Sequence, residues 1–170
     1  MVYLSHSQGL FPSPSREATR SRAVRPLVLV VDDSRSNRRM LQRLVQKLGY
    51  DVLLGEDGLG ALEKMKKKAA PDAGPRSGAE SPCLGRTVGE GVSLVLLDIS
   101  MPQMDGPTFA AALKRDHRYA GISIVGVTGN ALEEDRALFL EAGAAEIAMK
   151  AVGRDRVQGI LDKWVRGTAS

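Results

Sequence analysis

Five side chains able to bind metal or phosphate follow apolar stretches of the sequence, at the point where each stretch ends. They are Asp32 and Asp33 after LVLVV, Asp98 after SLVLL, Thr128 after ISIVGV, and Lys150 after EIAM. Carboxylates bind hard cations such as Mg²⁺, whereas an ammonium group and a hydroxyl hydrogen-bond to phosphate oxygens. A carboxylate can also accept a phosphoryl group and form an acyl phosphate. These residue types therefore indicate phosphate chemistry, provided that the fold brings them together.

The segments that carry these residues alternate between strand and helix patterns. Short apolar runs rich in β-branched residues predict strands at 27–31, 51–55, 93–97, 122–127 and 146–149. Apolar residues at helical spacing, with glycine or proline near the ends, predict helices at 34–48, 57–68, 107–116, 131–142 and about 154–166. Asn130 and Glu133 have the spacing of a capping box for the fourth helix. The alternation predicts an α/β fold with five parallel strands and helices on both faces of the sheet.

A parallel sheet brings the residues that follow its strands to one edge, where ligands bind. Taken singly, Asp32 or Asp33 could cap a helix, Lys150 could be a solvated surface residue, and Thr128 could hydrogen-bond to backbone. The convergence of all five favours a functional site. Three carboxylates at close range repel one another unless a cation lies among them, and a set of oxygen ligands suits Mg²⁺. Asp98 follows the strand expected at the centre of the sheet and is the best candidate for the nucleophile.

Length and composition exclude several other classes of protein. A chain of 170 residues suits one domain with tails, and a single cysteine, Cys83, excludes a disulfide framework and a cysteine-rich zinc site. No apolar stretch approaches the ~20 residues that span a bilayer, and no signal-peptide core is present, so we expect a soluble cytoplasmic protein without a membrane partner. No aromatic residue lies among the basic residues between Arg16 and Lys47. This favours a solvated helix face after a basic tail over nucleic-acid binding.

Two segments break the alternating pattern. Residues 1–26 hold three prolines and five serines without a sustained period, which predicts a disordered basic tail or linker. An organelle transit peptide or a fragment boundary would explain the same composition. Residues 69–92, rich in Ala, Gly, Pro and Ser, predict a surface insertion between a helix and a strand. We therefore expect one domain at 27–166, with this insertion, and a C-terminal tail at 167–170.

Four parts of the sequence resemble the receiver domain of two-component response regulators. They are VVDD (30–33), LLDISMPQMDG (96–106), VTGNA (127–131) and Lys150. The longer stretch VTGNALEEDRALFLEAGA is most similar to receivers of hybrid histidine kinases. The resemblance implies a flavodoxin-like sheet of order 2-1-3-4-5. It also implies that Asp98 accepts a phosphoryl group from a histidine kinase or a histidine phosphotransfer protein, and that the domain catalyses only its own phosphorylation and dephosphorylation.

The resemblance also implies a metal site and a switch. Asp33, Asp98 and the backbone carbonyl of Ser100 would bind Mg²⁺ directly, and Asp32 would act through water. Rearrangement of the face formed by residues 131–152 would then change partner interactions, and a dimer could form on phosphorylation. The first helix, with its basic residues, would dock a histidine-bearing helix pair, although a solvated face explains these residues equally well.

Two positions, Ala151 and Ile147, depart from the family pattern and bear on the implied switch. Lys150 would pair with the phosphoryl group and Thr128 would move to hydrogen-bond to it. Receivers usually carry proline after this lysine, commonly in a cis bond, whereas this chain has Ala151. We therefore expect weaker phosphoryl retention or blunted switching, and Lys150 in normal reach of Asp98 would count against this. Ile147 replaces the Tyr or Phe of many receivers, which predicts weaker coupling from Thr128 to the output face.

Two alternative functions share part of this evidence. A receiver-like protein-interaction module without a phosphorylation cycle is compatible with Ala151 and the insertion, but the intact acids, threonine and lysine argue against it. A metal-dependent aspartyl-phosphate phosphatase would also use a strand-end aspartate with Mg²⁺. Such enzymes typically need a second acid two residues after the nucleophile, and that position is Ser100.

Overall fold

The computed structural model describes residues 25–69, 91–129 and 132–167. Nearly all of the predicted N-terminal tail (1–26), insertion (69–92) and C-terminal tail (167–170) lies outside the described residues. No helix in the described part of the chain is long and apolar enough to cross a membrane.

Five parallel strands form one sheet in the order β2-β1-β3-β4-β5, which confirms the predicted α/β fold and strand order. The strands are β1 (Leu27–Val31), β2 (Asp51–Gly55), β3 (Val92–Leu97), β4 (Ser123–Thr128) and β5 (Glu146–Met149). From β1 the chain proceeds outward to β2, then crosses to β3 on the other side of β1. The sheet therefore has its topological switch point between β1 and β3, where ligands of such sheets bind.

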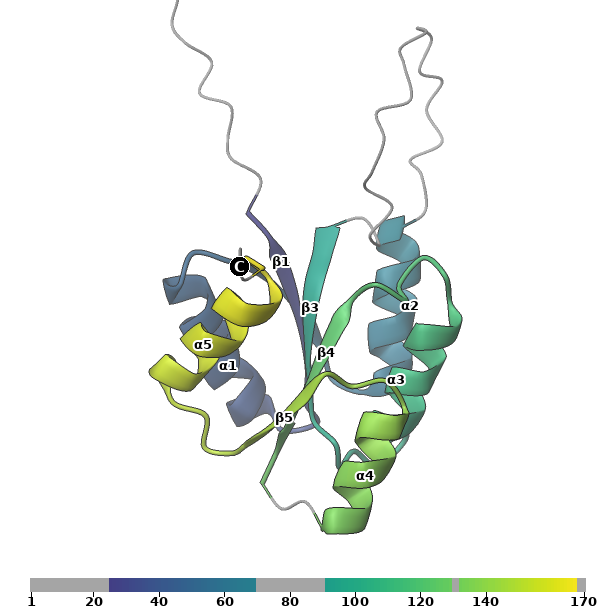
Figure 1. The fold of residues 1–170 in the computed structure, drawn as a ribbon. Coiled ribbons are helices and arrows are strands. Elements are labelled where there is room, and N and C mark those ends of the chain that lie inside the picture. The colour runs from purple at the N-terminus through teal and green to yellow at the C-terminus, as the bar shows by residue number, and fades with distance from the viewer. Residues whose placement is uncertain (1–24, 70–90, 130–131, 168–170) are drawn as a thin grey trace, which may run out of the picture.

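Helices cover both faces of the sheet, with α1 and α5 on one face and α2, α3 and α4 on the other (Figure 1). The helices are α1 (Arg35–Lys47), α2 (Gly58–Ala69), α3 (Gly106–Arg115), α4 (Glu133–Glu141) and α5 (Arg154–Trp164). Because the sheet is covered on both sides, alternate residues of β1 enter different cores. Val28 and Val30 pack in the core under α1 and α5, whereas Leu29 and Val31 pack in the core under α2 and α3.

The observed helices and strands begin and end within two residues of the predicted positions. The predicted capping box of the fourth helix is wrong. Leu132 occupies the position before α4 in an extended conformation and makes no side-chain capping hydrogen bond, and Asn130 lies outside the described residues. The first turn of α4 instead carries Glu133, Glu134 and Asp135, whose charges interact favourably with the positive end of the helix dipole.

The strands all run in one direction, so their carboxyl ends meet at one edge of the sheet. This edge is at the bottom of Figure 1, opposite the end at which the chain enters β1. The loops that follow β1, β3, β4 and β5 therefore lie together, and these are the loops that carry the five residues singled out from the sequence.

Helix α4, beside this edge, is held to the domain by one fully buried side chain, Phe139. The Phe139 ring lies against Gly126 of β4, where a Cβ atom would come within 2.5 Å of ring atom Cε1. Glycine is needed at position 126 because any larger residue would occupy the space of the ring. The position of α4 thus depends on one aromatic ring seated on one glycine.

We predict that Gly126→Ala lowers the free energy of unfolding by about 1–3 kcal/mol, since the added methyl group overpacks a closed core. Urea unfolding of the purified chain measures this change. Gly159→Ala in α5 is the matched control, because no described atom lies within 4 Å of its Cβ position. The control should leave stability unchanged or raise it by up to about 1 kcal/mol. Wild-type stability of Gly126→Ala would contradict the assigned packing.

Candidate functional site

Three carboxylates meet where β1 and β3 end side by side. Asp32 and Asp33 follow β1, Asp98 follows β3, and the Asp98 amide donates a hydrogen bond to the Val31 carbonyl at 2.8 Å. One oxygen from each carboxyl group lies within 4.8 Å of the other two. Asp32 and Asp98 are only 1% and 5% exposed, whereas Asp33 is open to solvent. The structure therefore brings together the three acids that the strand ends suggested.

Lys150 is the cation that reaches into this cluster. Its Nζ atom donates a hydrogen bond to Asp98 Oδ2 at 2.7 Å and forms an ion pair with Asp32 Oδ2 at 2.9 Å. The lysine follows β5, two strands away from β3, so the contact spans β4. Lys150 thus connects the carboxylates that follow β1 and β3 to β5, the edge strand of the sheet.

The two oxygens of Asp32 have different surroundings. Oδ1 accepts hydrogen bonds from the Ser34 amide at 2.8 Å and from Asn37 Nδ2 at 3.3 Å. Oδ2 is buried and accepts no hydrogen bond from the described residues, although the Lys150 ammonium lies beside it. A carboxylate oxygen can accept more than one interaction, so Oδ2 can bind a cation, or water held by a cation, in addition to its ion pair with Lys150.

Burying charged groups in the site costs free energy, and the pKa values of Asp98 and Lys150 reflect this. Burial raises the pKa of Asp98 above its usual value, the hydrogen bond and charge of Lys150 offset this only in part, and the charge of Asp32 adds to the rise. Burial by itself would lower the pKa of Lys150, but its contacts with Asp98 and Asp32 raise it, so this side chain stays charged. If all three acids are ionised, they and Lys150 together carry a net charge of −2, which one divalent cation would neutralise. The oxygen donors and this net charge fit Mg²⁺.

Thr128 ends β4 between the strands that carry Asp98 and Lys150. It is 1% exposed, and its carbonyl accepts a hydrogen bond from the Lys150 amide at 2.7 Å. Ser100 is exposed in the loop after β3 and donates its amide to Asp98 Oδ1 at 3.3 Å. Ile147 is half-buried in β5 and packs against the core under α2 and α3. Ile147 is therefore placed by its core packing, and no contact between it and the acid cluster is seen among the described residues.

The bond between Lys150 and Ala151 is cis, as it commonly is in receivers that carry proline at this position. Lys150 nevertheless reaches Asp98 at 2.7 Å. This distance counts against the expectation that Ala151 displaces the lysine and weakens phosphoryl retention.

The loop after Asp98 turns sharply into α3. The Gly106 amide donates to the Ile99 carbonyl at 2.9 Å, and Asp105 caps α3 by accepting from the Thr108 amide at 2.8 Å. A Cβ atom on Gly106 would lie 2.8 Å from Ile99 Cα and 3.0 Å from the Asp98 carbonyl oxygen. Gly106 is therefore required for the backbone to fold back beneath Asp98.

Arg38 is a residue of the site that the sequence analysis missed. The basic residues between Arg16 and Lys47 favour a solvated helix face, but Arg38 is only 7% exposed and faces inward. Its Nη1 donates to the carbonyl oxygens of Asp32 at 2.7 Å and Asp33 at 2.9 Å. The signal available in the sequence was spacing, because Arg38 precedes the buried Leu41 and Val45 by three and seven residues and so shares their face of α1.

Residues 81–162 of the chain match the family of the response regulator receiver domain. The chain belongs to this receiver family. Its receiver fold is similar to the chemotaxis protein CheY4 of Vibrio cholerae, with a TM-score of 0.66 and 25% identity over 83% of this chain and 99% of that chain. It is also similar to the receiver domain of sensor histidine kinase PA1611 of Pseudomonas aeruginosa, with a TM-score of 0.65 and 24% identity over 82% and 97% of the two chains. The PA1611 structure has a magnesium ion coordinated in its active site cleft.

The curated relatives of this receiver are sensor kinases, which it matches in their receiver segments. It is 31% identical over 137 residues to the sensor histidine kinase RcsC of Salmonella typhi, which covers 79% of this chain. It is 26% identical over 141 residues to the sensor histidine kinase CheAY of Helicobacter pylori, covering 82% of this chain. The chain spans only 12% and 15% of the length of these two relatives.

We predict that Asp98→Asn stabilises the receiver at pH 7 without divalent cations. A raised pKa means that folding disfavours the charged form of Asp98, and asparagine removes this charge from the buried site. A gain in Tm of a few degrees, about 1 kcal/mol, is expected in calorimetry. The gain should shrink as the pH falls through the raised pKa, because Asp98 of the wild type then becomes neutral as well. A variant less stable than wild type at pH 7 would contradict the assigned electrostatics.

Proposed function

We propose that the receiver is a phosphoacceptor in a two-component phosphorelay, with Asp98 as the residue that becomes phosphorylated. One observation carries this proposal. Asp98 Oδ2 lies 2.7 Å from the Lys150 ammonium, in an acid cluster at the switch point of the sheet. A carboxylate beside a fixed cation can accept a phosphoryl group, because the ammonium can follow the negative charge onto the phosphoryl oxygens.

The proposed transfer is an in-line exchange between two protein groups. The P–N bond to a histidine ring of the partner breaks while a P–O bond to an Asp98 oxygen forms. The imidazole leaves with the electron pair of the broken bond and takes up a proton at that nitrogen. Lys150 then exchanges its hydrogen bond with Asp98 Oδ2 for one with a phosphoryl oxygen, and the Thr128 hydroxyl donates to another.

Mg²⁺ is the proposed cofactor of this transfer. Asp33, Asp98 and the Ser100 carbonyl would hold it, and the carboxylate of Asp32 would act through a bound water. When bound, the ion would neutralise the phosphoryl oxygens as they approach the carboxylates. The same type of ion in the PA1611 receiver domain supports this assignment.

The proposed output surface is the face formed by residues 131–152. Four large apolar side chains are exposed there: Leu132, Leu138, Leu140 and Met149. Because Phe139 is the fully buried side chain that anchors α4, a small movement at Thr128 and Lys150 can shift this helix. A changed partner surface, or a dimer formed on phosphorylation, would follow. Weak coupling through Ile147 remains a prediction.

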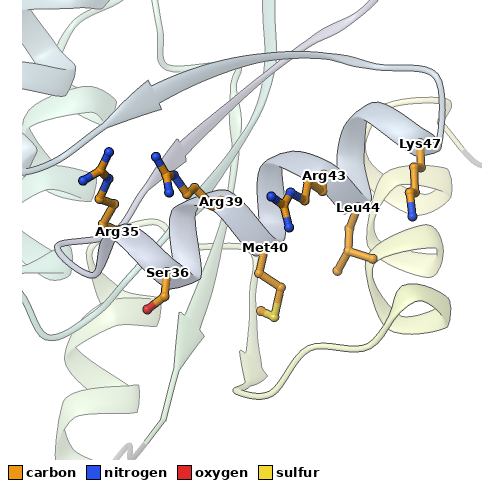
Figure 2. A pocket seen from close by; sticks show the side chains of 7 residues that line it. All are labelled: Arg35, Ser36, Arg39, Met40, Arg43, Leu44 and Lys47. Carbon is orange, nitrogen blue, oxygen red and sulfur yellow. The ribbon is translucent and has the colours of Figure 1, made fainter.

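The proposed docking surface for the phosphodonor is α1. Four cations, Arg35, Arg39, Arg43 and Lys47, follow one another at intervals of four residues along the helix. They line an open groove of about 740 Å³ together with Ser36, Met40 and Leu44 (Figure 2). Exposed cations around a partly apolar strip suit an acidic amphipathic helix, such as a helix of a histidine kinase or histidine phosphotransfer protein.

We assign the phosphoacceptor function to a domain at 27–166, with the insertion at 69–92 as an accessory segment. We propose that this domain acts in the cytoplasm.

Intact mass spectrometry with Mg²⁺ and acetyl phosphate tests the phosphoacceptor proposal. We expect a gain of one phosphoryl group per chain, lost on chelation of Mg²⁺ and absent in Asp98→Asn. A chain that is fully folded in Mg²⁺ but gains no phosphoryl group would contradict the proposal. That outcome would favour a receiver-like interaction module.

Charge reversal on α1 tests the docking surface separately. Arg39→Glu with Arg43→Glu should slow phosphoryl transfer from phosphorylated histidine phosphotransfer domains by at least about tenfold, because opposite charges steer the encounter. Phosphorylation by acetyl phosphate, which needs no docking, should be unchanged. Equal slowing with both donors would instead show damage to the site.

A further inference from the structure

Arg38 lies directly beneath the acid pair, and we infer that it is a positioning residue for metal binding. This inference rests on the proposed function and deepens it. The residue lies at the end of the first turn of α1, and its side chain extends back toward the loop between β1 and α1. It is the buried cation on the backbone side of the acid cluster, just as Lys150 is the cation on the carboxylate side.

The contacts of Arg38 are with the backbone that orients the two acids. Nη1 donates to the carbonyl of Asp32 at 2.7 Å and to the carbonyl of Asp33 at 2.9 Å. The same guanidinium donates through Nη2 to Glu56 Oε1, in the loop after β2, at 3.2 Å. Two consecutive peptide groups are therefore held by one planar group. The direction of both side chains, one buried and one exposed, depends on this anchor.

The charge of Arg38 has a second effect. Its guanidinium carries a positive charge and is almost fully buried, so solvent screens it little. It lies against the backbone carbonyl oxygens of Asp32 and Asp33, and its exposed partner Glu56 balances its charge on the solvent side. The cluster can thus be assembled before a cation arrives, which reduces the rearrangement that binding requires.

The neighbouring Arg39 makes no such contacts with the residues that the structure describes. Arg39 is exposed, and its side chain lies along the outer groove of α1 (Figure 2). Adjacent arginines on one helix therefore serve different purposes, Arg38 for the acid loop and Arg39 for the proposed docking groove. Arg39 is for this reason a matched control of the same residue type and the same helix.

The test is the affinity of the folded chain for Mg²⁺ itself, measured by isothermal titration calorimetry without any phosphodonor. We expect Arg38→Met to raise the Kd by about tenfold or more, as is usual when a partner that orients a metal ligand is removed. Arg38→Lys keeps the charge and stem but cannot hold two carbonyls and Glu56 together. Arg38→Lys should raise the Kd for Mg²⁺ by about threefold. If Arg38→Met fails to fold, the Kd of Arg38→Lys tests the inference in its place.

Two controls separate positioning from stability. Arg39→Met should bind Mg²⁺ like the wild type. Val45→Ala removes buried volume from α1 far from the acids and should lower Tm without changing the Kd. Wild-type Kd values in both Arg38 variants would overturn the inference and leave the proposed function intact. A wild-type chain that does not bind Mg²⁺ would overturn both.

Discussion

The Lys150 ammonium group joins two buried carboxylates that the sheet brings side by side, and the geometry of the site depends on this contact. Asp98 and Asp32 are both nearly inaccessible to water, and two buried negative charges at this distance would repel strongly if they were alone. The lysine follows β5, so it reaches them only if β1, β3, β4 and β5 keep their order and register. The fold and the site are thus coupled, because a shift of one residue in β4 or β5 would move Lys150 away from its partners.

The same contact explains why the site is suited to change. The raised pKa of Asp98 shows that Lys150 does not fully offset the cost of burying this carboxylate. An incoming cation and a phosphoryl group would alter the balance of charge at the carboxyl edge of the sheet. The neighbouring helix α4 is anchored to the domain by one fully buried side chain, Phe139. A change of charge beside an element that can shift is the physical basis of many two-state signalling domains.

Much of this arrangement could be predicted from the sequence. Buried parallel strands are short apolar runs, so LVLVV and SLVLL revealed their positions, and the residues after them marked the edge where the acids meet. Local chemistry at the helix ends was less informative. Asn130 and Glu133 have the spacing of a capping box, yet the extended backbone at Leu132 starts the helix later. The direction of a side chain was harder to predict, because Arg38 and Arg39 are identical in type and only their spacing from the apolar residues of α1 distinguishes them. The effect of Ala151 could not be predicted from the sequence, because Lys150 keeps its contact with Asp98 without proline, and weaker phosphoryl retention stays a prediction against which this contact counts.

A crystal structure of the chain with Mg²⁺ and fluoroberyllate, a mimic of a phosphoryl group, tests the central claim most directly. The account predicts beryllium bonded to a carboxylate oxygen of Asp98, with Mg²⁺ held by Asp33 and Asp98. The Lys150 ammonium should have moved from Asp98 Oδ2 to a fluorine atom. Fluoroberyllate absent from Asp98, or Mg²⁺ bound away from the acid cluster, would contradict it.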